Sequence, residues 1–283
     1  MIYHSYFGFH QAPFNLTPTT ALFHGLASHF EAIQTVLSAV DMGEGIIKVT
    51  GEVGTGKTLV CRMLINHLND RLHLIYLPNP ILSSLELKQA VAHELSLPNT
   101  LDSGSLVDAI HLKLLAIHQA GQSVVALIDE AQALSDEAIE TLRLFGNLET
   151  EHRKLLQIVI LGQPELDERL SQHSLRQFRQ RITFSAKLRP LSLSETVAYI
   201  DHRLIHSGGN AAIFSLSLKK SIWKATQGIP RVINQVCHKS LLLAFMGQKK
   251  QVQAEHVYHA LYDTFDVRKP KFRFPFLWGW SEV

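Results

Sequence analysis

Apolar residues in the first two thirds of the chain fall into two alternating patterns. Short apolar or β-branched runs predict strands, and they occupy residues 46–50, 72–77, 124–128, 155–161 and 182–186. The run at 124–128 has no polar residue, which indicates a strand buried on both faces of a parallel sheet. Between the runs, apolar residues recur every three or four positions, which predicts helices. This alternation is typical of an α/β domain.

The pattern changes at Pro190, after which only helical spacing is found. Helices are expected from Ser192 to about residue 206 and then at roughly 217–226, 230–246 and 253–264. The sequence therefore predicts an α/β fold with a parallel sheet flanked by helices, followed by an all-helical region. The expected parts are an N-terminal arm at 1–25, an α/β domain at 26–189, a helical lid at 190–265 and a tail at 266–283.

Serine residues mark where several helices are expected to begin. Ser28, Ser83 and Ser192 are each followed three positions later by a glutamate, which is the capping-box pattern. Ser135 is a single N-cap signal before an apolar helical pattern.

The strongest motif directly follows the first predicted strand. Residues 51–58 read G-x-x-x-x-G-K-T, and the apolar positions of a helix begin right after them. In this context the pattern binds phosphate, because glycines let backbone N–H groups approach an anion and the helix N-terminus adds its positive dipole end. The candidate phosphate-binding residues are Gly51, Glu52, Val53, Gly54, Thr55, Gly56, Lys57 and Thr58.

Two residues of this loop have separate expected roles, and an acidic pair complements them. Lys57 would place a positive charge on the outer phosphates of ATP, and the Thr58 hydroxyl would bind Mg²⁺.

Asp129 and Glu130 follow the run 124–128, at the strand end where parallel sheets bind ligands. Asp129 would hold Mg²⁺ through water, and Glu130 would act as general base toward the attacking water. The alternative for this pair is a helix cap beside a solvated acid.

Two further polar residues occupy positions from which they could reach the nucleotide. Gln163 stands at the tip of the predicted strand 155–161, where it could contact the γ-phosphate or orient the water; the alternative is a turn residue before Pro164. Arg231 follows Pro230 at the start of a predicted lid helix and could direct its charge at the nucleotide. The alternative for Arg231 is a surface position.

Three arginines lie within six residues just before the strand at 182–186. Arginine clamps phosphate with two parallel hydrogen bonds, and one supplied to a neighbouring subunit would act as an arginine finger. Arg181, directly before the strand, is the first candidate and Arg179 the second, with Arg176 as the third member. A solvated helix face or salt bridges are the alternative.

The composition indicates an ordinary globular protein and does not point to a particular partner. The chain has 283 residues, of which 46% are hydrophobic and 18% charged, an ordinary globular balance. The net charge of +2 gives no overall signal for a polyanion. We expect a reduced cytoplasmic protein, since the two cysteines lie in apolar helical patterns and neither a signal peptide nor a membrane span is visible.

Both ends of the chain are rich in aromatic residues. The N-terminal arm is expected to be extended, and it either walls the adenine pocket or simply packs on the domain. In the tail, basic residues interleave with aromatic ones between Arg268 and Trp280. The tail could dock on an anionic membrane, insert into a partner or, less favoured, stack on nucleic acid; the alternative is an arm that folds back on its own domain.

Several stretches together carry a family resemblance over nearly the whole chain to about residue 265. They are Tyr6–Phe9, Pro13–Pro18, Thr50–Thr58, Leu148–Thr150 and Leu156–Leu166. With the acidic pair, the arginine cluster and the Gly228–Arg231 segment, the chain resembles AAA+ ATPases of the ExeA (general secretion pathway protein A) type. Longer members continue into a membrane span and a peptidoglycan-binding region, and the shorter form resembles the ATPase type of mannose-sensitive haemagglutinin (MSHA) type IV pilus systems.

The resemblance implies a function. The chain would bind ATP and Mg²⁺, oligomerise into a ring or filament, and drive assembly of a pilus or secretion machine, peripherally at the inner membrane. Its partner there would be an inner-membrane component reached through the C-terminal tail. The alternative is a DNA-bound regulator, since the core also resembles ATPases that select transposition targets.

Overall fold

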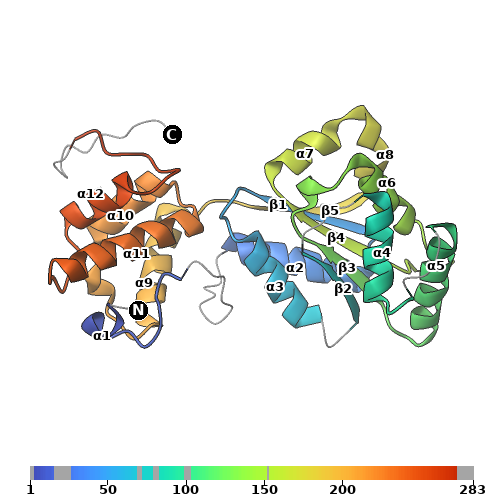
Figure 1. Ribbon diagram of the computed structural model, residues 1–283, viewed down its shortest axis with the longest axis horizontal. Helices are drawn as coiled ribbons and strands as arrows, with labels where there is room; N and C mark the ends of the chain where they lie inside the picture. Colours follow the sequence, from blue (N-terminus) through green and yellow to red (C-terminus); the bar gives the residue numbers. More distant parts are fainter. Residues whose placement is uncertain are drawn as a thin grey trace. The chain divides into compact units, whose positions relative to one another are not determined.

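The computed structural model describes residues 3–15, 27–68, 72–78, 83–98, 103–151 and 153–272. The chain divides into two compact units, seen in Figure 1. The α/β unit comprises Ala27–Val53 and Lys57–Leu188, and the helical unit comprises Met1–Leu26, Gly54–Gly56 and Arg189–Val283.

The α/β unit is built on a five-stranded sheet in which every pair of neighbouring strands is parallel. Its strands are β1 (Ile46–Gly51), β2 (His73–Leu77), β3 (Val124–Ile128), β4 (Gln157–Gly162) and β5 (Ile182–Leu188), in the order β2-β3-β4-β1-β5. The predicted parallel sheet is therefore confirmed. Because the strands run the same way, the ends of β1, β3 and β4 meet at one edge, where Thr50 pairs with Gly162 and Ile128 with Ile160.

Helices cover both faces of this sheet (Figure 1). The helices of the unit are α2 (Ala27–Met42), α3 (Lys57–Leu68), α4 (Ser84–Glu94), α5 (Ser103–Gln119), α6 (Asp136–Phe145), α7 (Pro164–Ser171) and α8 (Arg176–Arg179), with 3₁₀ turns at Ala131–Ala133 and His173–Leu175. Helices α2 and α3 contact β1, whereas α4 contacts β2 and α5 contacts β3. The cap at Ser83 forms as predicted, with Glu86 closing the capping box, and the Ser135 hydroxyl accepts from the Ala138 N–H.

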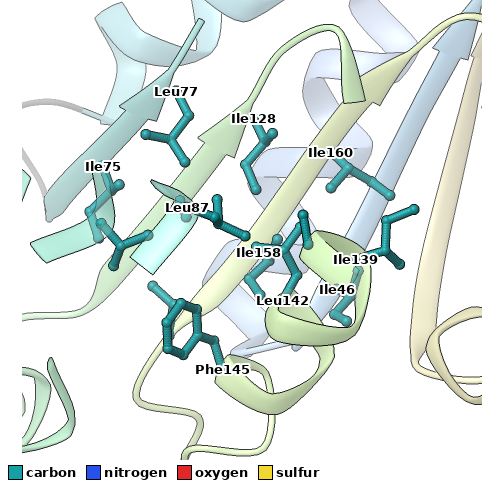
Figure 2. Close-up of a cluster of buried hydrophobic side chains, with 14 of the residues drawn as sticks. Ile46, Ile75, Leu77, Leu87, Ile128, Ile139, Leu142, Phe145, Ile158 and Ile160 are labelled. Atoms are coloured by element: carbon teal, nitrogen blue, oxygen red, sulfur yellow. The ribbon is translucent and has the colours of Figure 1, made fainter. Parts of the chain in front are cut away.

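One large hydrophobic cluster lies between the sheet and α4, α5 and α6. Figure 2 shows Ile128 and Ile158 of neighbouring strands on the same side of the sheet as Leu142 and Phe145 of α6. These four side chains are at most 2% exposed. Burial of several such side chains, each contributing about 1.5–3 kcal/mol, fixes the strand ends that carry the candidate site.

The helical unit has its own core, to which the N-terminal arm belongs. Its helices are α1 (His4–Phe7), α9 (Leu193–Ile205), α10 (Leu216–Thr226), α11 (Pro230–Met246) and α12 (Ala254–Tyr262), with a 3₁₀ turn at Ala211–Ile213. Tyr3 and Phe14 of the arm are each 1% exposed, and the Tyr3 hydroxyl is 2.7 Å from Nδ1 of His238 on α11. The Ser192–Glu195 capping box that starts α9 forms as predicted.

Two local predictions are wrong. Ser28 lies inside α2 rather than before it, and its buried hydroxyl has no hydrogen-bond partner among the described residues, so it does not cap the helix. The arm also contains the short helix α1, where an irregular extended segment was expected. Aromatic contacts explain α1, since Tyr6 packs edge-on against Phe245 and Lys250 lies 3.7 Å from the Tyr6 ring centroid. The adenine-wall alternative for the arm stays a prediction, and residues 16–26 lie outside the described residues.

Candidate active site

The phosphate loop closes around the ammonium group of its own lysine. β1 ends at Gly51 and α3 begins at Lys57, with Gly54 and Gly56 at φ of +82° and +107°, where a side chain is strained. Lys57 is 6% exposed, and its Nζ donates to the carbonyl oxygen of Gly51 at 2.6 Å and to that of Glu52 at 3.1 Å. The lysine thus stands at the first position of the helix, between the loop and the acidic pair.

The charges around the Lys57 ammonium suit the binding of a phosphate group. Burial lowers the pKa of the Lys57 ammonium, and the nearby carboxylates of Glu130 and Asp129 oppose that shift. An anion at the loop would favour the charged form further. The phosphates of ATP therefore fit a site where a buried positive charge, loop N–H groups and a helix N-terminus come together.

Asp129 and Thr58 are brought together, as a shared metal site requires. Asp129 is 3% exposed, and its carboxylate accepts hydrogen bonds from the Thr58 hydroxyl and, at 2.9 Å, from the Glu130 N–H. Burial raises the pKa of the Asp129 carboxyl, and the bond from the Glu130 N–H opposes this. Two hard oxygen donors beside a phosphate loop fit Mg²⁺, which retains water ligands and takes phosphate oxygens. When bound, Mg²⁺ would neutralise charge on the phosphates.

Glu130 is held by two glutamine side chains. Its backbone has a φ of +54°, in the left-handed region, directly after β3. Its Oε2 accepts from Nε2 of Gln132 at 2.5 Å and from Nε2 of Gln163 at 3.0 Å. Burial alone would raise the pKa of the Glu130 carboxyl, yet the two hydrogen bonds together lower it. Glu130 is therefore ionised at neutral pH, as a general base must be.

Gln132 was not predicted from the sequence. Besides its bond to Glu130, its Oε1 accepts from the Gln163 N–H at 3.0 Å, so one side chain joins the ends of β3 and β4. Arg169 of α7 fixes the turn by donating to the carbonyl of Gln132 at 2.8 Å and that of Leu134 at 2.6 Å. The only sequence signal for Gln132 is its place two residues after the acidic pair.

The arginine cluster lies at the opposite end of the sheet from the phosphate loop. Ile182 pairs with Ile46 at the start of β1, whereas Leu188 pairs with Gly51 at its end. At about 3.3 Å per residue, the length of β5 puts Arg181 about 20 Å from the loop of its own unit. An arginine side chain does not span that separation, so Arg181 is not brought to the site of its own subunit. Arg176 and Arg179 are exposed, and Arg179 donates to the Ser171 carbonyl at 3.2 Å.

Arg231 starts α11 and contacts Gly54, with which it shares the helical unit. The Arg231 N–H donates to the Gly54 carbonyl at 3.2 Å, and a Cβ on Gly54 would come within 2.8 Å of the Arg231 Cβ. The side chain of Arg231 is exposed. Its backbone is therefore held against Gly54, while the contact of its guanidinium with nucleotide stays a prediction.

Among the residues that the structure describes, no helix is both long and apolar enough to cross a bilayer. The expected tail at 266–283 is described as far as Phe272, and residues 273–283 lie outside the described part.

Comparisons with known proteins agree with this geometry. Residues 40–170 match the AAA domain family. General secretion pathway protein A of Aeromonas hydrophila is 38% identical over 269 residues, which cover 94% of this chain and 49% of that protein. The chain thus spans about half the length of this curated relative.

Solved structures with similar folds are more distant in sequence. Cdc6p of Pyrobaculum aerophilum has a TM-score of 0.66 at 16% identity, covering 87% of this chain and 69% of that one. The Holliday junction branch migration motor RuvB of Thermotoga maritima has a TM-score of 0.56 at 16% identity, covering 88% of this chain and 73% of that one. These likenesses concern the fold alone.

The fold is of the AAA+ type, residues 40–170 match the AAA domain family, and the phosphate loop and acidic pair fit ATP and Mg²⁺. Within that class, the chain is related to General secretion pathway protein A.

Proposed function

We propose that this AAA+ ATPase assembles from several copies and drives construction of a type IV pilus or secretion machine at the inner membrane, in the manner expected of an MshM-type pilus ATPase. The observation that carries the proposal is the 38% identity to General secretion pathway protein A, which extends over 94% of this chain. The inner-membrane component is the proposed partner, and the C-terminal tail is the proposed contact. The cytoplasmic face of the membrane is the proposed location.

Assembly from several copies is supported by where the arginines lie. Arg181 is at the end of the sheet opposite its own phosphate loop, so it can contribute to hydrolysis only in the site of another subunit. A finger supplied between subunits would couple ATP hydrolysis to oligomerisation. Within one subunit, Glu130 would act as base and Gln163 would contact the γ-phosphate or orient the attacking water, while Arg231 would sense the bound nucleotide.

The test is ATP hydrolysis as a function of protein concentration, with and without duplex DNA, at ~0.15 M salt, where non-specific phosphate contacts are weakened. We expect a rate per subunit that rises with concentration and ignores DNA, because each site needs a neighbour's arginine. A rate that rises only with DNA would overturn the assembly proposal in favour of a DNA-bound regulator. A rate per subunit that is constant over all concentrations would overturn the proposal that each active site is completed by an arginine of a neighbouring subunit.

A further inference from the structure

Charge is distributed very unequally along the chain. Residues 189–272 hold twelve lysines and arginines against five aspartates and glutamates, a net charge of +7, whereas residues 1–188 hold fourteen against nineteen, a net charge of −5. Three of the five acids in the first range are already in ion pairs, Glu195 with Arg189, Asp201 with Lys219 and Asp263 with Lys239. Such an asymmetry points to an anionic partner for the helical unit.

The chain after α12 folds back on the helical unit, and buried residues alternate with exposed ones along it. Val267 and Pro270 are buried, while Arg268, Lys269 and Lys271 are exposed. Two hydrogen bonds fix this segment: the Arg268 N–H donates to the Ala225 carbonyl at 2.9 Å, and the Tyr262 hydroxyl donates to the Pro270 carbonyl at 2.8 Å. Figure 1 shows this stretch lying beside α10 and α12.

This arrangement joins basic residues of α10 to those of the segment. Arg268 lies beside Ala225, whose neighbour Lys224 is exposed, and Lys220 is exposed one turn earlier on α10. Lys269 Nζ lies 5.8 Å from the Tyr262 ring centroid. We give the name basic–aromatic face to the exposed residues of this segment together with the two exposed lysines of α10 that it approaches through Ala225: Lys220, Lys224, Phe265, Arg268, Lys269, Lys271 and Phe272. Asp266 is an acid beside this face.

Two phenylalanines of the face are exposed to water. The side chain of Phe265 is 86% exposed and that of Phe272 58%. A ring on which a nucleic-acid base stacks usually lies flat on the protein with one side open. At 86% exposure, the Phe265 side chain instead lies almost wholly in water in the turn after α12. An exposed apolar ring among cations is the arrangement that enters the boundary between lipid headgroups and acyl chains.

We propose that the basic–aromatic face binds the surface of an anionic phospholipid membrane. The lysines and arginines contact lipid phosphates, and Phe265 and Phe272 enter the interface. This contact is with lipid itself, so it goes beyond the proposed assembly role and does not depend on it. Beyond Phe272, the sequence continues with Phe274, Phe276, Trp278 and Trp280, residue types that also prefer the interface.

The experiment is sedimentation of the full chain with vesicles of phosphatidylethanolamine and phosphatidylglycerol, compared with vesicles of phosphatidylcholine alone. We expect binding to the anionic vesicles that weakens as salt is raised. The triple variant Lys224→Gln, Arg268→Gln, Lys269→Gln should bind about a hundredfold more weakly, since each cation near an anionic surface contributes roughly fivefold. Phe265→Ser should weaken binding about tenfold, with little salt dependence.

Matched controls separate this face from general charge effects. The triple variant Lys113→Gln, Arg153→Gln, Lys187→Gln removes the same charge from the α/β unit, and Leu112→Ser replaces a side chain that is 66% exposed there. Both should bind vesicles like the unaltered chain, and ATP hydrolysis should be unchanged in all four variants. Equal loss in the control triple variant would overturn the proposal, and so would equal binding to both vesicle types. Binding to duplex DNA at the same salt concentration that is lost in the first triple variant, without vesicle binding, would assign the face to nucleic acid instead.

Discussion

The amide Nε2 of Gln163 donates to Oε2 of Glu130 over 3.0 Å, which joins the tips of two neighbouring strands of the sheet. A polar contact at this point lets the residue at the end of β4 fix the direction of the Glu130 carboxylate, the proposed general base. Gln132 reinforces the contact by binding the Glu130 carboxylate with its Nε2 and the Gln163 N–H with its Oε1. Glu130, Gln132 and Gln163 thus form a closed hydrogen-bonded set that holds the Glu130 carboxylate.

Replacing Gln132 by leucine tests this set. We expect Gln132→Leu to lower kcat about tenfold without weakening ATP binding, because Glu130 loses a hydrogen bond that orients it. The same loss raises the pKa of Glu130, so the acid limb of the rate–pH profile should move to higher pH. Gln122→Leu, at an exposed glutamine, is the control and should leave the profile unchanged. If the acid limb is the same in Gln132→Leu, Gln132 does not act on the ionisation of Glu130, and its proposed role is wrong.

Removal of the loop ammonium should abolish nucleotide binding. In Lys57→Ala the outer phosphates lose a charge-assisted contact, and we expect ATP affinity to fall about a hundredfold or more. Calorimetric titration with MgATP measures this directly. Lys154→Ala, which removes a surface lysine paired with Glu149, should bind ATP normally. Unchanged affinity in Lys57→Ala would contradict the assignment of residues 51–58.

Arg181→Ala should slow hydrolysis about a thousandfold at unchanged ATP affinity, if the finger acts on a neighbouring subunit. Mixing two inactive variants makes the test decisive. Glu130→Gln should block turnover while keeping nucleotide binding, yet it retains Arg181. Added to Arg181→Ala, it should therefore restore part of the activity. If mixing restores nothing and Arg179→Ala is the inactive variant instead, the finger role passes to Arg179.

Much of the α/β fold could be predicted because its signals are local. The strands 46–50 and 124–128 were predicted within one residue of β1 and β3, since continuous apolar runs bounded by polar motifs have few alternative structures. Asp129, Thr58 and Gln163 could be placed at one edge because parallel strands carry their following residues to the same side.

The features that could not be predicted from the sequence depend on contacts between residues far apart in the chain. Gln132 gains its role only when β3 and β4 lie side by side, and no spacing rule describes that. The net charge of +2 concealed the basic face, because an acidic α/β unit offsets the helical unit in the total. Ser28 has the sequence of a cap, yet α2 already includes Ala27, and packing of Ala32 and Val36 decides the helix more strongly than a serine hydroxyl does.

The salt bridge between Arg189 and Glu195 should make stability depend on pH. Two hydrogen bonds of 2.6 and 2.8 Å from Arg189 lower the pKa of Glu195 to about 2, below its unfolded value of about 4.3. Because the pKa of Glu195 is lower in the folded chain, its ionised carboxylate stabilises the fold at pH values above the unfolded pKa. This stabilisation disappears as the pH falls from there to about 2. Solvent exposure of both side chains reduces the contribution to about 1 kcal/mol.

Urea unfolding of Glu195→Gln and the unaltered chain measures this contribution. The variant should be about 1 kcal/mol less stable at neutral pH, and the difference should shrink below about pH 4 and approach zero near about pH 2. Arg189→Gln, which removes the partner, should show the same trend. A difference that stays constant with pH would mean that the charge of Glu195 does not stabilise the fold.

Gly228 has no space for a side chain, and this gives the sharpest stability prediction. Its φ is +75°, and a Cβ would stand 2.0 Å from the carbonyl oxygen of Leu191. That carbonyl accepts from Nε1 of Trp223 at 3.0 Å, and the Leu191 N–H donates to the Gly228 carbonyl at 2.8 Å. The contact fixes the turn that leads through Pro230 into α11. Gly228→Ala must therefore break it, and we expect a loss of about 3 kcal/mol in the free energy of unfolding.

Gly121→Ala separates the two causes of that loss. Gly121 has a φ of +80°, yet a Cβ there would meet nothing within 4 Å, so the substitution introduces only the left-handed backbone strain of about 1 kcal/mol. Urea unfolding of both variants gives the cost of the clash with Leu191 as the difference. If Gly228→Ala loses no more than Gly121→Ala, the segment around Leu191 moves aside easily. The turn would then not hold the backbone of Arg231 in place, and the sensing role proposed for that arginine would lose its structural support.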